Sequence, residues 1–234
     1  MRLSTLSLLA ALALASACKG DPAQARVEDK PPTGPARPDP GRISPSDEQA
    51  RFDRERHPEL IVKALGLTPG AIVADVGAGT GLLTIHLARA VAPGGRVVAT
   101  DVDGAVLDML ESRLAPEHLV DVVERRVVSA DLPGLEAGRY DAILLAQVDH
   151  YFSDPAAWLR AAAPALKANG RLVIENRTYH REPALAAAAA AGFRLVTEST
   201  EVPGEFIATF QVAAPVTPPT KTPDKPAVKP KEAP

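Results

Sequence analysis

This chain of 234 residues carries three glycines at alternate positions between an apolar run and a helical pattern, namely Gly77, Gly79 and Gly81. The apolar run, residues 71–76, predicts a strand, and a second apolar run over residues 96–101 ends in an acid, Asp101. Glycine lets the chain turn at positive φ and lets a ligand lie against bare backbone. Strand, glycine turn, helix, strand and acid in this order are typical of an α/β nucleotide-binding sheet.

The spacing of these glycines and the acid before them distinguish two ligand classes. Dinucleotide-binding turns read G-x-G-x-x-G, whereas this turn reads G-x-G-x-G and is preceded by Asp75. A carboxylate at this position repels a pyrophosphate and attracts a cationic group such as an ammonium or a sulfonium. An acid after the second strand can accept hydrogen bonds from both hydroxyls of a ribose. The expected ligand is a nucleoside that carries a cationic amino acid.

On these motifs the sequence resembles the class I S-adenosylmethionine-dependent methyltransferases. The resemblance covers roughly residues 50 to 212 and is carried by the glycine motif, the ribose-binding acid and three later segments: residues 75–81, Asp101, and residues 129–132, 140–146 and 166–174. The last segment looks like the family's helix, turn and fifth strand. The resemblance implies S-adenosylmethionine as cofactor and a Rossmann-like methyltransferase fold with a reversed seventh strand.

The resemblance also implies a set of cofactor-binding residues. Asp75 and the glycine turn would lie near the amino acid part, Asp101 on the ribose and Asp131 near the adenine. The full expected set comprises Asp75, Gly77, Ala78, Gly79, Gly81, Asp101, Val102, Asp131, Leu132 and Gln147.

Hydrophobic patterns along the chain predict an α/β fold with a doubly wound, mostly parallel seven-stranded sheet. Strands are expected at residues 71–76, 96–101, 122–128, 140–146, 170–175, 193–198 and 205–212. Helices are expected at residues 47–65, 81–91, 104–114, 155–167 and 182–191. The charges of the first helix, which include Arg51, Arg54 and Arg56, fit either a lid over the cofactor or a solvated face.

A polar segment after the fourth predicted strand, residues 147–152, is the candidate site for chemistry, because ligands of open α/β sheets bind at the carboxyl ends of strands. His150 fits a general base on a substrate O–H or N–H, and Asp149 fits a group that orients it. Tyr151 could line the pocket. The other interpretation is that this segment merely caps the sheet before the next helix.

Composition excludes several classes of function. The net charge of −3 and the few aromatic residues argue against nucleic acid as the main partner. No pair of histidines has metal-ligand spacing, so we expect no metal site. A single cysteine, Cys18, leaves no internal disulfide and no cysteine nucleophile in the domain.

The N-terminus of the chain predicts export. Residues 1–17 have the basic start, short apolar middle and small residues of a secretory signal. Cys18 directly follows, which resembles a bacterial lipoprotein signal over residues 1–18, although plain cleavage before Cys18 also fits. We expect a Pro-rich linker over residues 19–45, a domain over 46–212 and a Pro/Lys-rich tail over 213–234, the linker and tail being disordered. The predicted location is the bacterial cell envelope, lipid-anchored or periplasmic.

From these observations we expect a methyltransferase that acts on an oxygen or nitrogen nucleophile of a small molecule or a protein. We expect it to be a monomer that is tethered to the membrane at Cys18. The alternative is an envelope protein that binds S-adenosylmethionine or a nucleoside without turnover, since the cofactor is made in the cytosol. A nicotinamide-binding reductase is disfavoured by Asp75.

Overall fold

The computed structural model describes residues 44–213. Its strands are β1 (Ile72–Val76), β2 (Arg96–Asp101), β3 (Val123–Val127), β4 (Tyr140–Ala146), β5 (Leu166–Arg177), β6 (Phe193–Ser199) and β7 (Glu205–Val212). Its α-helices are α1 (Pro45–Arg56), α2 (Pro58–Leu65), α3 (Thr84–Val91), α4 (Gly104–Leu114), α5 (Pro155–Ala162) and α6 (Arg181–Ala190). The signal over residues 1–18, Cys18, most of the predicted linker and nearly all of the tail lie outside the described residues.

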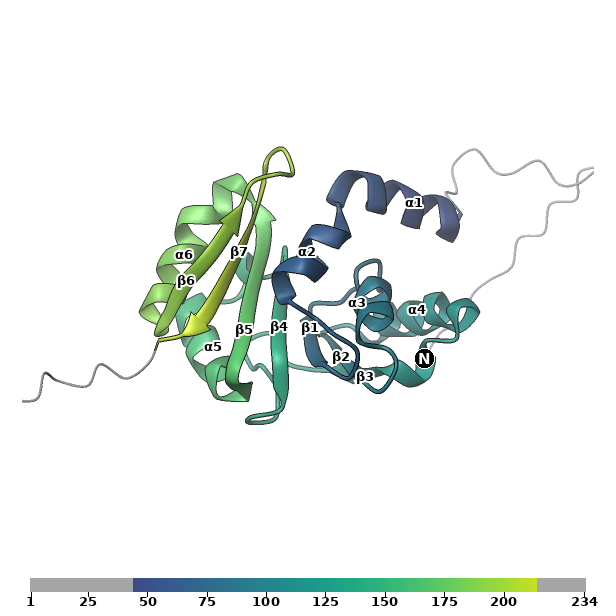
Figure 1. Ribbon diagram of the computed structural model, residues 1–234, viewed down its shortest axis with the longest axis horizontal. Helices are drawn as coiled ribbons and strands as arrows, with labels where there is room; N and C mark the ends of the chain where they lie inside the picture. Colours follow the sequence, from purple (N-terminus) through teal and green to yellow (C-terminus); the bar gives the residue numbers. More distant parts are fainter. Residues whose placement is uncertain (1–43, 214–234) are drawn as a thin grey trace, which may run out of the picture. The chain divides into compact units, whose positions relative to one another are not determined.

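The seven strands form one sheet in the order β3-β2-β1-β4-β5-β7-β6 (Figure 1). Neighbours from β3 to β5 are parallel, and β7 is antiparallel to both β5 and β6. The predicted fold class, a doubly wound sheet with a reversed last strand, is confirmed. Strand order reverses between β1 and β4, so a ligand crevice is expected outside the carboxyl ends of these two strands.

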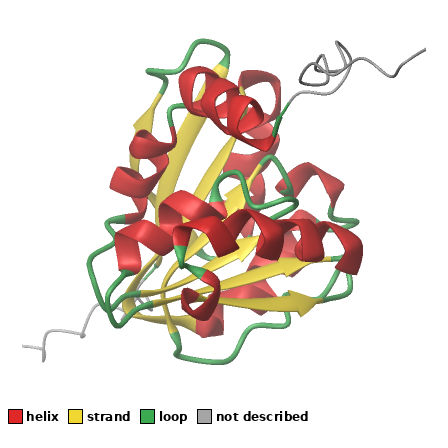
Figure 2. Cartoon of the chain, turned by 90° about the vertical axis from the view of Figure 1, so that its right-hand side faces the viewer, coloured by secondary structure: helices red, strands yellow, loops and turns green. Residues whose placement is uncertain are grey.

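Helices cover both faces of this sheet (Figure 2). Side chains of α2, α3 and α4 pack with Val73 and Val97 in one buried cluster. Side chains of α5 and α6 pack with Ala74 and Val98 in the other. Successive strand residues thus enter opposite cores, because side chains alternate along a strand. This burial on both faces explains why the strands read as continuous apolar runs.

Two predicted helices break or end early, and proline explains both. The helix expected over residues 47–65 is two helices, because His57 adopts a left-handed φ of 47° before Pro58. The helix expected over 155–167 ends at Ala162 because Pro164 lacks the N–H that would continue it. Residues 166–169, predicted as helix and turn, instead begin the long strand β5.

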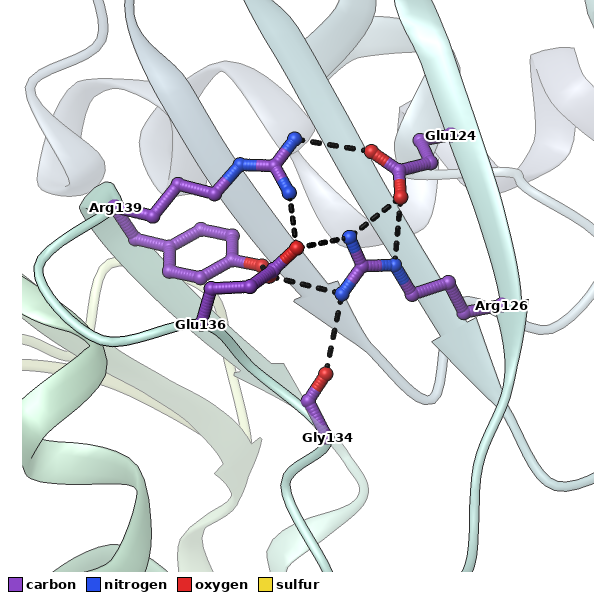
Figure 3. A network of polar contacts seen from close by, with 6 residues as sticks. Glu124, Arg126, Gly134, Glu136 and Arg139 are labelled. Carbon is purple, nitrogen blue, oxygen red and sulfur yellow. Dashed lines mark hydrogen bonds and ion pairs between the residues drawn. The ribbon is translucent and has the colours of Figure 1, made fainter.

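A network of ion pairs holds the connection between β3 and β4, whose residues 128–139 run without a helix (Figure 3). Arg126 pairs with Glu124 and Glu136, each at 2.5 Å, and Arg139 pairs with both acids. Hydrogen bonds from Arg126 hold the pKa of Glu136 well below its usual range. Burial raises the pKa of Tyr140, which donates to Glu136, to about 12. These contacts fix the connection, and we assign the network a structural role.

None of the helices between residues 44 and 213 is both long and apolar enough to cross a lipid bilayer. The same part of the chain contains no group of three or more His, Cys, Asp or Glu side chains arranged to hold a metal ion.

Candidate functional site

The glycine turn lies between the end of β1 and the start of α3. Gly77 and Gly79 adopt φ values of 71° and 53°, which side chains with a Cβ rarely tolerate. A Cβ on Gly77 would lie 2.7 Å from Val148, whereas a Cβ on Gly79 would meet open space. The N–H groups of Gly77 and Ala78 donate to the carbonyl of Thr100 on β2. The turn is therefore held against β2, and the space beside the Cα of Gly79 is open.

Asp101 ends β2 beside this turn. Its Oδ2 accepts a hydrogen bond from the N–H of Gly79 at 2.9 Å, and its Oδ1 accepts from the N–H of Asp103 at 3.1 Å. A carboxylate offers about four lone-pair positions, so two backbone bonds orient the group and leave further positions for a ligand. Sequence reasoning paired the turn with this acid, and the structure brings the two into direct contact.

A cavity of about 420 Å³ opens next to the turn and Asp101. Five of the predicted cofactor residues line it, namely Gly77, Asp101, Val102, Leu132 and Gln147. Phe152 and Trp158 also line it, and their rings stack 4.4 Å apart. An apolar cavity with one oriented carboxylate at its edge suits a nucleoside, whose flat base is apolar on its faces and whose ribose donates hydrogen bonds.

Two predicted acids lie outside the set of residues that line this cavity. Asp75 is only 2% exposed, and its Oδ2 accepts a hydrogen bond from Thr84 at 2.7 Å. Burial raises the pKa of Asp75 to about 6. Asp131 accepts hydrogen bonds from the N–H and the hydroxyl of Ser153. Asp75 thus ties the end of β1 to the start of α3, and Asp131 ties the loop after β3 to the segment before α5.

Gln147, directly after β4, has the left-handed φ of 53°. Such a conformation costs free energy in a residue with a side chain and is common where a functional group must be placed. Its N–H donates to the carbonyl of Glu175 at 2.8 Å, and its side chain lies within 3.4 Å of the Glu175 carboxylate. The strained residue therefore joins the cavity to the end of β5.

A buried charge cluster adjoins Gln147, and sequence reasoning missed it. Glu175 and Glu205 are 1% and 3% exposed, and Arg56 of α1 bridges them at 2.6 and 3.2 Å. Arg177 also pairs with Glu205, at 3.2 Å. Burial raises the pKa of Glu175 to about 7, against the opposing charge of Arg56. Among the charged side chains of α1, Arg51 and Arg54 are exposed, whereas Arg56 is only 17% exposed and serves as a counter-charge to buried acids.

Helix α1 does not cover the cavity. The residues that line the cavity come from elsewhere in the described chain, and α1 contacts other parts of the carboxyl edge. Its Glu48 pairs with Arg113 of α4, its Asp53 contacts His86 of α3, and its Arg56 reaches β5 and β7. The helix spans this edge as a strap, and Gln49 of α1 donates to the carbonyl of Leu82 just after the glycine turn, so the interpretation as a lid stays a prediction.

The polar segment after β4 meets the end of β5 through Asn176. Asn176 is 1% exposed, and its Nδ2 donates to Asp149 at 2.7 Å and contacts His150 Nδ1 at 3.0 Å. An amide nitrogen only donates, so His150 Nδ1 accepts and the proton of the neutral ring lies on Nε2. Burial, together with the nearby His180, lowers the pKa of His150. The structure thus presents His150 as a neutral donor through Nε2, which favours positioning over proton abstraction.

A family model described as a methyltransferase domain matches residues 74–172. The ubiquinone biosynthesis O-methyltransferase of Xanthomonas axonopodis pv. citri is 36% identical over 154 residues, which span 62% of this chain and 60% of that protein. The protein of the same description from Xanthomonas oryzae pv. oryzae is 35% identical over 154 residues, with the same coverage. The match therefore spans about three fifths of the length of these relatives.

Solved structures share the fold at low identity. A SAM-dependent methyltransferase from Aquifex aeolicus aligns with a TM-score of 0.64 and 21% identity, over 74% of this chain and 100% of that one. Geranyl diphosphate C-methyltransferase from Streptomyces coelicolor aligns with a TM-score of 0.58 and 17% identity, over 75% and 86%. The [4+2]-cyclase SpnF aligns with a TM-score of 0.59 and 16% identity, over 69% and 82%. The architecture is the Rossmann-like methyltransferase fold, which also carries other chemistry.

Proposed function

We propose that this chain is a class I S-adenosylmethionine-dependent methyltransferase that methylates an oxygen nucleophile of a small molecule. The observation that carries the proposal is the carboxylate of Asp101, oriented by the N–H of Gly79 at the edge of the apolar cavity. The names of the relatives, which are O-methyltransferases, support oxygen as the nucleophile.

The cavity and its surroundings fit this cofactor. Asp101 would hold the ribose, Val102 and Leu132 would flank the adenine, and the bare backbone at Gly79 would admit the amino acid part. Asp75 would contribute indirectly, through the bond from Thr84 that fixes the turn. When bound, S-adenosylmethionine would supply a methyl group on positively charged sulfur, for transfer to an oxygen nucleophile that loses its proton, with S-adenosylhomocysteine as the leaving group. The chain's main task is then to hold the nucleophile in line with the methyl carbon.

We expect His150→Ala to lower turnover by about ten- to a hundredfold and His150→Gln to retain most of it. The reason is that His150 acts as a hydrogen-bond donor to the acceptor oxygen, and a glutamine amide can replace an Nε2–H donor whereas alanine cannot. S-adenosylhomocysteine formation, measured across the pH range with each variant, checks this. Equal losses in both variants, with a changed pH profile, would instead identify His150 as a general base.

The rival function is binding of the cofactor without turnover. To separate these two functions, the full-length chain is incubated with S-adenosylmethionine and small-molecule extracts, either with or without hydroxyl-bearing compounds. S-adenosylhomocysteine is then measured by mass spectrometry. Acceptor-dependent S-adenosylhomocysteine supports the methyltransferase. Saturable cofactor binding with no product in any extract supports the silent binding protein.

We further propose that the chain is exported and anchored to a membrane through a lipid on Cys18. This rests on the signal-like residues 1–17 and on the position of the single cysteine after them. We expect the full chain in the membrane fraction and Cys18→Ala in the soluble fraction of expressing bacteria, because one lost lipid anchor removes most of the apolar attachment. Equal partitioning of both proteins, measured by immunoblot, would contradict the anchor.

A further inference from the structure

One arginine near the end of α4 joins the glycine turn to helix α1. The Nε of Arg113 donates to the carbonyl of Thr80, in the middle of the turn, at 2.9 Å. Its Nη2 pairs with Glu48 of α1 at 2.7 Å, and its Nη1 lies 3.3 Å from both the side-chain oxygen of Gln49 and the carbonyl of Pro45. The side chain of Arg113 is only 10% exposed. A single guanidinium thus holds the turn on one side and the start of α1 on the other.

Helix α4 lies directly against the turn at this point. A Cβ added to Gly81 would lie 2.6 Å from Leu110, so the backbone of the turn and this helix are in close contact. Because residues three positions apart share a face of a helix, Arg113 projects from the same face as Leu110 and reaches the turn. An arginine suits this position, since its planar guanidinium carries five N–H donors in a fixed fork, whereas lysine presents one compact charge.

Helix α1 itself is docked mainly by polar contacts. None of the residues of α1 is buried, and Phe52 packs only partly buried against the core. A cavity of about 560 Å³ is lined by residues of α1, α3 and α4, so these helices do not pack tightly on one another there. Gln49 donates to the carbonyl of Leu82 at 2.9 Å. Helix α1 is thus linked to the carbonyls on both sides of the third glycine of the turn, directly at Leu82 and through Arg113 at Thr80.

We propose that Arg113 is a positioning residue that clamps the glycine turn to α1, so that the docking of α1 sets the affinity for S-adenosylmethionine. The inference rests on the proposed function and names a regulation of the same site. With α1 docked, the turn is held at its carbonyls, and the N–H of Gly79 stays in place against the carboxylate of Asp101. With α1 released, the guanidinium of Arg113 loses its partners on α1, and its bond to Thr80 is no longer held in place.

Coupling of this kind acts in both directions. If docked α1 favours the cofactor, the bound cofactor favours docked α1 by the same factor. The residues that line the cofactor cavity include neither Arg113 nor Thr80 nor any residue of α1. Protection of α1 by the bound cofactor would therefore distinguish the clamp from a purely structural role, because direct contact with the cofactor does not account for it.

Calorimetric titration of the full-length chain with S-adenosylmethionine measures the first direction. We expect Arg113→Met to weaken binding by about 5- to 100-fold, within the usual range of coupling between two sites. Arg113→Lys keeps the charge opposite Glu48, so its affinity should lie between those of Arg113→Met and the unchanged chain. Glu48→Gln removes the ion pair from the α1 side and should weaken binding by about two- to fivefold. The side chain of Glu48 is 39% exposed, so this variant tests the clamp even where Arg113→Met does not fold.

Arg125→Met is the matched control. The polar contacts of Arg125 within residues 44–213 are to α4 and not to the turn, since it pairs with Asp108 and Glu111. Its loss should leave the affinity for S-adenosylmethionine unchanged. Glu48→Gln added to Arg113→Met should have no further effect, because both substitutions break the same link.

Backbone hydrogen exchange, measured by mass spectrometry, reads the second direction. Saturating S-adenosylmethionine should slow exchange over residues 45–56 in the unchanged chain and in Arg125→Met, but not in Arg113→Met. Without cofactor, exchange of the turn over residues 77–83 should be faster in Glu48→Gln than in the unchanged chain.

Unchanged affinity in both Arg113→Met and Glu48→Gln, or exchange of α1 that the cofactor does not slow, overturns the clamp and leaves the proposed function standing. If the unchanged chain does not bind S-adenosylmethionine, the proposed function is overturned, and the exchange of the turn alone decides the clamp. Faster exchange in Glu48→Gln then supports a turn clamped to α1, and equal exchange overturns it.

Discussion

Asp101→Ala is expected to weaken the binding of S-adenosylmethionine by about 10²–10⁴-fold, measured by calorimetric titration. Each ribose hydroxyl that donates to the carboxylate forms a hydrogen bond to a charged group, worth about 1.5–3 kcal/mol, and two are lost together. The substitution also removes the acceptor for the N–H of Gly79, which loosens the glycine turn. Asp101→Asn keeps one carbonyl oxygen, so its affinity for S-adenosylmethionine should lie between those of the unchanged chain and Asp101→Ala.

Asp103→Ala is the matched control for this prediction. Asp103 lies two residues away, but its carboxylate caps α4 by accepting from the N–H of Ala105 at 2.8 Å. Loss of such a cap lowers the free energy of unfolding by about 1 kcal/mol and leaves the cavity unchanged. If the affinity for S-adenosylmethionine is unchanged in Asp101→Ala, or equally reduced in both variants, Asp101 does not bind the ribose.

Arg56→Met is expected to lower the free energy of unfolding by about 3–5 kcal/mol at pH 8, measured by urea denaturation. Arg56 lies between two carboxylates that are at most 3% exposed, and its removal leaves two buried negative charges short of a counter-charge. Arg54→Met provides the control, because Arg54 is on the same helix but exposed, and its loss should change stability by no more than about 0.5 kcal/mol.

The loss in Arg56→Met should depend on pH. Burial raises the pKa of Glu175 from 4.5 to about 7, so the folded chain binds this proton more tightly than the unfolded chain. The resulting stabilisation is complete below about pH 4.5 and is lost as the pH rises through 7. Without Arg56 the carboxyl of Glu175 becomes even harder to ionise. The loss of stability in Arg56→Met should therefore be largest at pH 8 and smaller at pH 6. A deficit below 1 kcal/mol, or one independent of pH, would contradict the role given to Arg56.

The sequence predicted the parts of the fold that local patterns determine. Strands β2, β4 and β7 and helix α4 begin and end at the predicted residues, because apolar runs, turns and caps mark both of their ends. The glycine turn and Asp101 were also predictable, since glycine at positive φ and an acid after the second strand have local signatures. The prolines Pro58 and Pro164 were visible in the sequence too, and greater weight on them would have corrected both boundary errors.

The rest of the site depends on contacts between distant residues. Arg56 meets Glu175 across 119 positions, and its neighbours Arg51 and Arg54 are exposed, so nothing local distinguishes it. The buried acid Glu175, at the end of an apolar strand, was the available signal, because such a group requires a counter-charge. No local pattern marks His180 as a neighbour of His150. The adjacency of the fourth and fifth strands in the expected fold would have placed it beside His150.

The tautomer of His150 could not be predicted from the sequence. It follows from Asn176, whose amide nitrogen reaches both Asp149 and His150 from the neighbouring strand. Similarly, the sequence does not reveal that the carboxylate of Asp75 accepts a hydrogen bond from Thr84, nine residues later. The role of each polar side chain thus depended on which partner the fold brings to it.

Calorimetric titration of the full-length chain with S-adenosylmethionine, beside an identical titration with NADH, tests the central claim most directly. The oriented carboxylate of Asp101 and the apolar cavity predict one saturable site per chain for S-adenosylmethionine, competed by S-adenosylhomocysteine, and no saturable heat with NADH. Absence of saturable S-adenosylmethionine binding, or tighter binding of NADH, would contradict it.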